Sequence, residues 1–241
     1  MLKVGHRGAK AYAPENTLSS FRKALTMGVD MVEFDVRISK DKYPIVVHAN
    51  HLRRLTQQFV RVNKLTLEQI KKLKVKKTET IPTLGEVLRV IDNKIGLNIE
   101  LKEKGSAQIV VQTLRDLGVN FENVMIASNH PSELAMVENL EPSIVTALVF
   151  RSGNAFNIWF ILDFLAILFL PFTKYYISWV FKRSGADYLN INHHFLDAKK
   201  VALFKKRGIR IFAWTVNSQK KIDYLKSLGI EGIITNYPDR L

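Results

Sequence analysis

Three carboxylates and two imidazoles in this sequence have the types and spacing that metal-assisted acid–base chemistry needs. Glu33 and Asp35 lie two residues apart in an apolar run, so in a strand their side chains share one face. Glu100 lies in another apolar run, and the chain has no cysteine. Three oxygen donors of this kind suit a hard divalent cation, Mg²⁺ or Ca²⁺. His6 and His48 could act as base and acid, because an unperturbed histidine titrates near pH 6.5, at about neutrality.

Two cationic side chains stand beside these candidates. Arg7 follows the first histidine directly, and Lys102 lies two residues beyond Glu100. Arginine could hold a phosphate through its two-pronged guanidinium, and lysine could offset phosphate as a point charge. On the motifs alone a structural reading stays open, in which Glu33 and Glu100 simply form ion pairs with Arg7 and Lys102.

Eight short apolar runs alternate with helical patterns along the chain. The predicted strands are Leu2–His6, Met31–Val36, Gly96–Leu101, Val124–Ser128, Val145–Phe150, Tyr188–Ile191, Ile209–Thr215 and Gly232–Asn236. Eight strands with helical crossovers favour an α/β fold, the closed (β/α)₈ TIM barrel, with residues 1–241 as one domain. An open doubly wound sheet is the alternative, but no Gly-x-Gly-x-x-Gly turn supports dinucleotide binding. In a barrel the carboxyl ends of the strands form the active-site rim, so the candidates would converge there.

The run Pro44–His48 begins too soon after Val36 for a parallel crossover, which takes about a dozen residues. We therefore predict a β-hairpin after strand two, and a symmetric turn at Lys40–Tyr43 would place Asp35 beside His48. Residues from about 36 to 92 then form an insertion with helices near 67–73 and 84–91.

Seven ordered sequence blocks, spread from the first strand to the last residues, resemble the glycerophosphodiester phosphodiesterase family. The blocks are His6-Arg7-Gly8, Pro14-Glu15-Asn16-Thr17, Val32-Glu33-Phe34-Asp35-Val36, Pro44-Ile45-Val46-Val47-His48, Asn98-Ile99-Glu100-Leu101-Lys102, Trp214-Thr215-Val216-Asn217 and Gly232-Ile233-Ile234-Thr235-Asn236-Tyr237-Pro238. One block alone would be a weak signal, but seven in order are highly specific.

The resemblance implies a TIM-barrel phosphoric diester hydrolase that cleaves glycerophosphodiesters to glycerol phosphate and an alcohol. By motif position, the metal ligands would be Glu33, Asp35 and Glu100, the acid–base pair His6 and His48, and the substrate-binding residues Arg7, Lys102 and Trp214. In the mechanism that the resemblance implies, a glycerol hydroxyl can attack phosphorus, and water then opens the cyclic phosphate.

Two positions depart from the pattern that the resemblance implies. Ala49 follows the second histidine where the family usually has aspartate, which affects either the orientation of His48 or the affinity for metal. Asn50 or His51 could substitute for the missing carboxylate. Asn129 follows Ser128 where phenylalanine is usual, which would reshape the pocket.

The charge balance favours an anionic partner. Lys plus Arg number 36 against 22 for Asp plus Glu, which gives a net charge of +14. A lysine-rich solvated surface would explain the same charge. No nucleic-acid-binding motif is present, so we expect no nucleic-acid partner. The chain opens on a predicted strand without an apolar leader, and we expect a cytoplasmic protein.

One strongly apolar segment, Ile158–Phe172, lies within an insertion at about 153–182 after strand five. It is shorter than the about 18 residues that a membrane span needs. At the mouth of the barrel it could be a lid or an anchor at the membrane surface, receiving the chain of a lysophospholipid-like substrate. It could instead pack on the barrel or on a second copy. Lysophospholipase D-type hydrolysis and a catalytically weak, membrane-associated lipid-binding barrel are therefore kept as alternatives.

Overall fold

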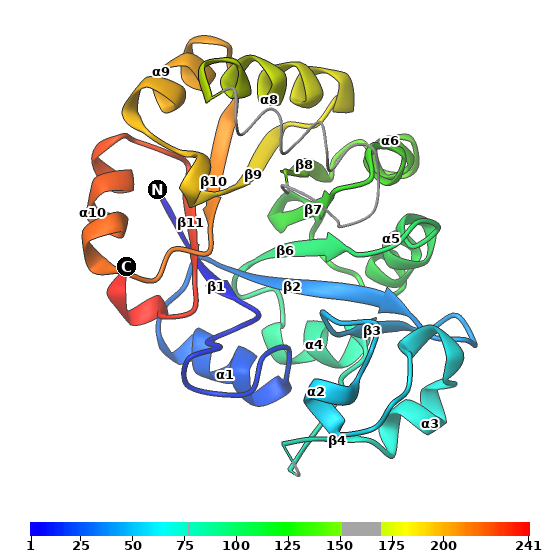
Figure 1. Cartoon of the computed structure of the whole chain (residues 1–241). Helices are drawn as coiled ribbons and strands as arrows, with labels where there is room; N and C mark the ends of the chain where they lie inside the picture. The colour runs from blue at the N-terminus through cyan, green and yellow to red at the C-terminus, as the bar shows by residue number, and fades with distance from the viewer. Residues whose placement is uncertain (77, 151–169) are drawn as a thin grey trace.

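The computed structural model describes residues 1–76, 78–150 and 170–241, and within these residues eight parallel strands close into a barrel (Figure 1). The strands are β1 (Leu2–His6), β2 (Met31–Ile38), β6 (Gly96–Leu101), β7 (Val124–Ser128), β8 (Val145–Phe150), β9 (Tyr188–Asn192), β10 (Arg210–Trp214) and β11 (Gly232–Thr235). The barrel closes because β1 pairs in parallel with both β2 and β11. The predicted (β/α)₈ fold is confirmed, and the eight strands begin and end within two residues of their predicted bounds.

The described helices around the barrel are α1 (Leu18–Thr26), α4 (Leu84–Ile91), α5 (Ala107–Asp116), α6 (Pro131–Leu140), α8 (Leu170–Ser184), α9 (Ala198–Lys206) and α10 (Gln219–Ser227). Several of them begin at a side chain that caps a free backbone N–H group. Thr17 accepts a hydrogen bond from Ser20 at the start of α1, and Thr83 and Glu86 form a reciprocal capping box at the start of α4. Gly28 follows α1 with a φ of 65°, in the left-handed region that glycine tolerates best.

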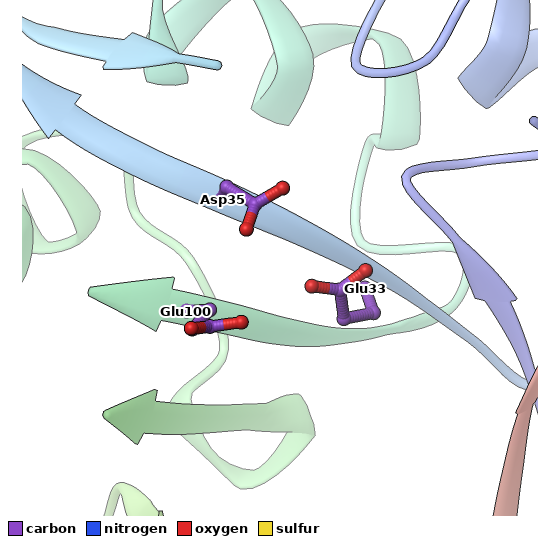
Figure 2. Close-up of side chains that lie close together, drawn as sticks. All are labelled: Glu33, Asp35 and Glu100. Atoms are coloured by element: carbon purple, nitrogen blue, oxygen red, sulfur yellow. The ribbon is translucent and has the colours of Figure 1, made fainter. Parts of the chain in front are cut away.

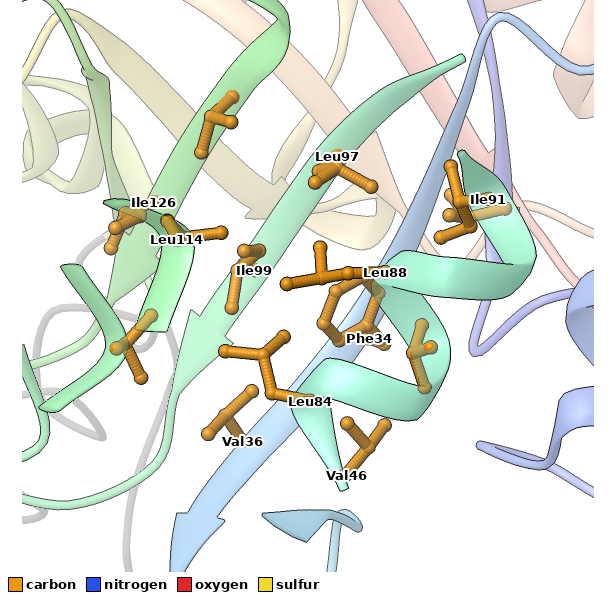
Figure 3. Close-up of a cluster of buried hydrophobic side chains, with 14 of the residues drawn as sticks. Phe34, Val36, Val46, Leu84, Leu88, Ile91, Leu97, Ile99, Leu114 and Ile126 are labelled. Atoms are coloured by element: carbon orange, nitrogen blue, oxygen red, sulfur yellow. The ribbon is translucent and has the colours of Figure 1, made fainter. Parts of the chain in front are cut away.

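The wall of the barrel alternates between an apolar outer face and a partly polar inner face, because successive side chains of a strand point to opposite sides. On β2, Phe34 faces outward into a buried cluster, and Figure 3 shows it against Leu88 and Leu84 of α4. Glu33 and Asp35, on either side of Phe34, face the inside of the barrel. Burial of each large apolar side chain stabilises the fold by about 1.5–3 kcal/mol, so the outer cluster holds the inner carboxylates in place.

The N-terminal end of the barrel is closed by a buried apolar layer that includes Val4, Met31, Met125 and Phe212. Gly232 makes room for this layer: a Cβ atom there would lie 2.2 Å from the Phe212 ring. The inside of the barrel is therefore filled from below and open only at the C-terminal rim.

The predicted hairpin is confirmed, and it opens a small lobe beside the end of β2 (Figure 1). The lobe consists of β3 (Pro44–Val46), α2 (Arg53–Thr56), η1 (Val62–Lys64), α3 (Leu67–Lys71), β4 (Lys74–Val75) and β5 (Glu79–Thr80). It has its own apolar cluster, whose fully buried members include Ile45, Leu52 and Ile70. The lobe therefore holds β3 firmly against the barrel.

The predicted register of the hairpin was wrong by one residue. Val36 pairs with Val46, and the Val47 N–H donates to the Asp35 carbonyl over 2.9 Å, so Asp35 lies opposite Val47 and not His48. Ser39 pairs with Tyr43, so the loop of the hairpin consists of residues 40–42, and Lys42 adopts a φ of 69° there.

The apolar segment Ile158–Phe172 lies outside the described residues except for its last three residues, which begin α8. Among the helices that the structure does describe, none combines the length and the apolar character needed to cross a bilayer. Three short 3₁₀ helices complete the described elements: η2 (Phe121–Asn123), η3 (His193–Phe195) and η4 (Pro238–Arg240).

Candidate active site

A cavity of about 280 Å³ opens at the C-terminal rim of the barrel. The side chains around it are His6, Arg7, Glu33, His48, Asn98, Glu100, Ala127, Val149, Asn190, Asn192, Trp214, Thr215 and Ile234. Six of the eight predicted site residues are in this set. The side chains of the other two, Asp35 and Lys102, are buried and do not line the cavity. Asp35 contacts Arg7 and Lys102, and Lys102 also contacts Glu100.

The three predicted metal ligands come together on neighbouring strands. Figure 2 shows Glu33 and Asp35 on β2 and Glu100 on β6, with oxygen atoms that all lie within 4.8 Å of one another. The parallel register explains this closeness, because Asp35 pairs directly with Glu100. All three side chains are buried. Their arrangement is a compact, oxygen-only donor set of the kind that binds Mg²⁺ or Ca²⁺.

Charge is distributed unequally over this cluster. The Lys102 ammonium lies 3.1 Å from Asp35 and 2.9 Å from Glu100, and Arg7 Nε lies 3.2 Å from Asp35. Burial by itself would raise the pKa of Asp35, but these two cations outweigh it and hold that pKa below its ordinary value.

Glu33 has a different environment from Asp35. It accepts a hydrogen bond from the Arg7 backbone N–H over 3.1 Å, and within the described residues it forms no ion pair with a lysine or arginine side chain. Burial, followed by the charges of Asp35 and Glu100, raises the pKa of Glu33 to about 8. The cluster thus contains one carboxylate more than its protein cations balance. Of the ion pairs expected from the structural reading, that of Lys102 with Glu100 is present, whereas the Arg7 side chain pairs with Glu15 and Asp35 instead of Glu33.

The two predicted histidines reach the cavity from different elements. His6 ends β1, and its Nδ1 donates to Asn236 Oδ1 over 2.6 Å, so Nε2 faces the cavity and lies 3.8 Å from Glu33. Burial and then the charge of Arg7 lower the pKa of His6 to about 4. The imidazole is therefore neutral at pH 7 and presents an unprotonated nitrogen.

The hairpin brings His48 to the lining of the same cavity. The His48 carbonyl accepts a hydrogen bond from Arg37 Nε over 2.9 Å, which anchors the backbone at this position. Neither Asn50 nor His51, the predicted substitutes for the aspartate that Ala49 replaces, contributes to the cavity lining. The hairpin backbone and Arg37 thus hold His48 without a carboxylate at position 49.

The loop between β1 and α1 contains supporting residues that sequence reasoning did not assign. Glu15 binds Arg7 over 2.8 Å and Lys10 over 2.7 Å, and these cations lower its pKa to about 2 although burial opposes the charge. Asn16 adopts a φ of 58° and donates to Asp35 over 3.0 Å. Both residues belong to the sequence block Pro14-Glu15-Asn16-Thr17, and this block was the sequence feature that could have identified them as site residues.

Asn98, Asn190 and Asn236 are the other site residues that sequence reasoning missed. Asn98 lies two residues before Glu100, on the same face of β6. Asn190 occupies the cavity-facing side of β9, and Asn236 directly follows β11. Strand alternation next to the predicted carboxylates would have identified Asn98, but neutral amides carry no charge pattern that marks them as chemically important.

Comparisons with known proteins agree with this geometry. The model of the glycerophosphoryl diester phosphodiesterase family matches residues 6–240. The Bacillus subtilis protein YhdW is 35% identical over 99% of this chain and 96% of its own length. A glycerophosphodiester phosphodiesterase of Caldanaerobacter subterraneus is 30% identical over 100% of this chain and 96% of its own length.

Solved structures give the same result. An Oleispira antarctica phosphodiesterase, determined with the product sn-glycerol-3-phosphate, has a TM-score of 0.83 and 26% identity over 98% of this chain and 93% of its own. The Thermotoga maritima glycerophosphodiester phosphodiesterase has a TM-score of 0.77 and 27% identity over 99% and 96%. The chain therefore belongs to the glycerophosphoryl diester phosphodiesterase family. It is an enzyme of the phosphoric diester hydrolase class, as the sequence resemblance implied.

Proposed function

We propose that this enzyme hydrolyses glycerophosphodiesters to glycerol phosphate and an alcohol, with a divalent cation held by Glu33, Asp35 and Glu100 and with His6 and His48 as the acid–base pair. One observation carries the proposal: three buried carboxylates, with oxygen atoms within 4.8 Å of one another, adjoin a cavity that two histidines also line. Family membership supplies the class of substrate.

The donor set fits a hard cation such as Mg²⁺ or Ca²⁺, because every donor is a carboxylate oxygen. The raised pKa of Glu33 supports this fit, since a cation would offset the repulsion that makes ionisation of this carboxyl unfavourable. When bound, the cation would supply Lewis-acid polarisation of a phosphoryl oxygen. The choice between Mg²⁺ and Ca²⁺ is left to the experiment below.

In this proposal His6 and His48 each carry out one of the two proton transfers. His6 Nε2, left unprotonated by the Asn236 hydrogen bond, takes the proton of the attacking hydroxyl. His48, which also lines the cavity, gives a proton to the oxygen of the departing alcohol. Where the attacking group is a glycerol hydroxyl, a cyclic phosphate forms, and the two histidines exchange roles when water opens it.

The remaining predicted residues bind substrate in this proposal. Arg7 lines the cavity, and its guanidinium would offset the charge of the phosphate. Trp214 forms part of the wall that contacts the substrate. A phosphate contact by Lys102 stays a prediction, because its ammonium lies on Asp35 and Glu100 behind the cavity.

The test is hydrolysis of glycerophosphocholine with Mg²⁺, with Ca²⁺ and with a chelator, followed by detection of glycerol phosphate and choline. We expect turnover that one of the metals restores after chelation, and a higher metal requirement in Glu100→Gln. Glu122→Gln, at an exposed position away from the rim, is the matched control. Turnover that a chelator leaves unchanged would contradict the metal site, and absence of turnover with either metal would favour the lipid-binding alternative.

A specific feature of α8 supports a second proposal, contact with an anionic membrane surface that would give access to lipid-bearing substrates. Tyr175 and Trp179 are about half exposed and lie one helical turn apart. Lys174 and Arg207 lie over the Tyr175 ring, and Arg183 lies over the Trp179 ring. Exposed aromatic rings flanked by cations are typical of the membrane interface, and the net charge of +14 adds to the attraction.

Vesicle sedimentation tests this second proposal. We expect binding to vesicles that contain phosphatidylserine, weaker binding after Tyr175→Ser combined with Trp179→Ser, and no change after Tyr43→Ser at an exposed site in the hairpin turn. Equal binding by both variants would contradict a role for α8. A change in oligomeric state without vesicle binding would instead indicate that α8 packs against a second copy.

A further inference from the structure

Two asparagine side chains in the cavity are buried but lack hydrogen-bond partners. Asn98 on β6 is 0% exposed and Asn190 on β9 is 3% exposed, and both line the cavity. Both amide atoms of Asn98 and the carbonyl oxygen of Asn190 form no hydrogen bond within the described chain. A buried amide without a partner is unfavourable, so such groups in a cavity indicate a polar ligand.

Asn98 lies deeper than Asp35 and Glu100, and it pairs in register with Glu33 on the neighbouring strand. Asn98 precedes Glu100 by two residues on β6, which places it about 7 Å further into the barrel. Asn190 pairs in register with Phe212 of the apolar layer that closes the barrel from below. The two amides thus form part of the floor of the cavity, which we call the amide floor.

The chemistry of the amide floor restricts what it can bind. Glu33 is the ionisable lining residue beside Asn98, and the proposed function assigns it to the cation. The other lining residues near the amides, Ala127, Val149 and Ile234, are apolar, so no cationic side chain of the floor would recognise a phosphate. Amide groups both donate and accept hydrogen bonds, and alcohol hydroxyls do the same. A neutral, hydroxyl-bearing group is therefore the ligand that fits.

We infer that Asn98 and Asn190 bind the glycerol end of the substrate and require its terminal hydroxyl to be free. This inference rests on the proposed function, in which Arg7 offsets the charge of the phosphate. Glycerol is the part that all glycerophosphodiesters share, so an enclosed floor suits it, whereas the variable alcohol faces the open rim. An acyl group on the terminal hydroxyl would remove the donor and would need space that the layer below already fills with Met125 and Phe212.

The first part of the test compares three substrates of the wild-type enzyme that share the same leaving group, choline. They are glycerophosphocholine, 2-hydroxypropyl phosphocholine and a short-chain 1-acyl lysophosphatidylcholine below its micelle concentration. The second keeps the hydroxyl next to the phosphate-bearing carbon and lacks only the terminal hydroxyl. We expect kcat/KM to be roughly 10- to 100-fold higher for glycerophosphocholine than for either of the others, since a buried site rejects an analogue that leaves its amides unpaired.

The second part tests the amides themselves. Asn190→Leu keeps the volume but removes the hydrogen bonds, and we expect the preference for glycerophosphocholine over 2-hydroxypropyl phosphocholine to fall toward unity, with partial recovery in Asn190→Ser. Asn98→Leu should reduce the same ratio, and Asn190→Leu keeps the inference testable if Asn98→Leu fails to fold. Asn139→Leu, at an exposed position on α6, should keep the wild-type ratio.

The outcomes separate this inference from the proposed function. Equal turnover of the glycerol and hydroxypropyl substrates by the wild-type enzyme would overturn the amide floor and leave the proposed function standing. An unchanged preference in both Asn190→Leu and Asn98→Leu would also overturn it. Failure of the wild-type enzyme to hydrolyse any of the three substrates would overturn both.

Discussion

The two halves of the barrel rim present different kinds of side chain to the same cavity. The half built from β1, β2 and β6 supplies four ionisable side chains, His6, Arg7, Glu33 and Glu100, together with Asn98, and further charged groups are packed behind it. The half built from β8, β9 and β10 supplies Val149, two asparagines and Trp214, with no ionisable group among them. Both halves belong to the same closed sheet.

The difference indicates a division of work. Charged groups gathered on one side can share partners, as Lys102 does between Asp35 and Glu100, and this sharing makes their burial tolerable. The uncharged side needs no such compensation and can be shaped for a particular substrate. We therefore expect substitutions of the ionisable groups on the charged half to change the rate of the chemical step or the stability, and substitutions of the uncharged cavity residues, Asn98 included, to change substrate binding.

The largest effect is expected from the base on the charged half. His6→Ala should lower kcat for glycerophosphocholine by about 100- to 10,000-fold, because the attacking hydroxyl then lacks a proton acceptor. His51→Ala, at an exposed position in the lobe, is the control and should keep the wild-type rate. Steady-state kinetics at saturating substrate measures both. A His6→Ala enzyme that retains more than a tenth of the wild-type kcat would contradict the expectation that the charged half of the rim carries out the chemical step.

The next effect concerns stability and pH. The pKa of Glu15 is lowered to about 2, so its charge stabilises the fold above its unfolded-state pKa, and this contribution is lost as the pH falls toward 2. Glu15→Gln should therefore reduce the free energy of unfolding at pH 7 by on the order of 2 kcal/mol, since Arg7 and Lys10 lose their partner.

Denaturant unfolding of wild type and Glu15→Gln at several pH values measures this difference. The gap between them should narrow as the pH falls from about 5 to about 2, where the wild-type carboxyl becomes protonated. Glu122→Gln provides the exposed control. A gap that stays constant over this pH range would show that the Glu15 charge is not what stabilises the charged half.

The smallest effect is expected on the uncharged half. Trp214→Leu should raise KM for glycerophosphocholine roughly tenfold and change kcat much less, because the side chain forms wall surface rather than reacting groups. Trp179→Leu, on the outer face of α8, should leave both constants unchanged for this water-soluble substrate. If Trp214→Leu lowered kcat as strongly as His6→Ala, the two halves would not be separable.

The strands and the convergence of the candidates could be predicted because both depend on regular patterns. Apolar runs with helical crossovers predict a parallel barrel, and strand ends in a barrel meet at one rim. The hairpin register could not be predicted to the residue, because Lys42 adopts a left-handed backbone conformation that a lysine in the sequence does not indicate. The roles assigned to the individual site residues stay predictions.

The directions of individual side chains could not be predicted from the sequence either. The spacing of Glu100 and Lys102 predicts that they share a face, but not that Lys102 turns behind the cavity toward Asp35. Asn236 was visible only as part of a sequence block, because its partner His6 lies at the other end of the chain. Contacts of this kind arise from barrel closure and have no local sequence pattern.

The bond between His6 and Asn236 links the first strand of the barrel to the residue after the last one. In the proposed mechanism this bond leaves Nε2 available as the base, so the proposed role of a residue on the first strand depends on the last strand having paired beside it. A chain truncated before β11 would retain Glu33, Asp35 and Glu100 but would lack the partner that orients His6.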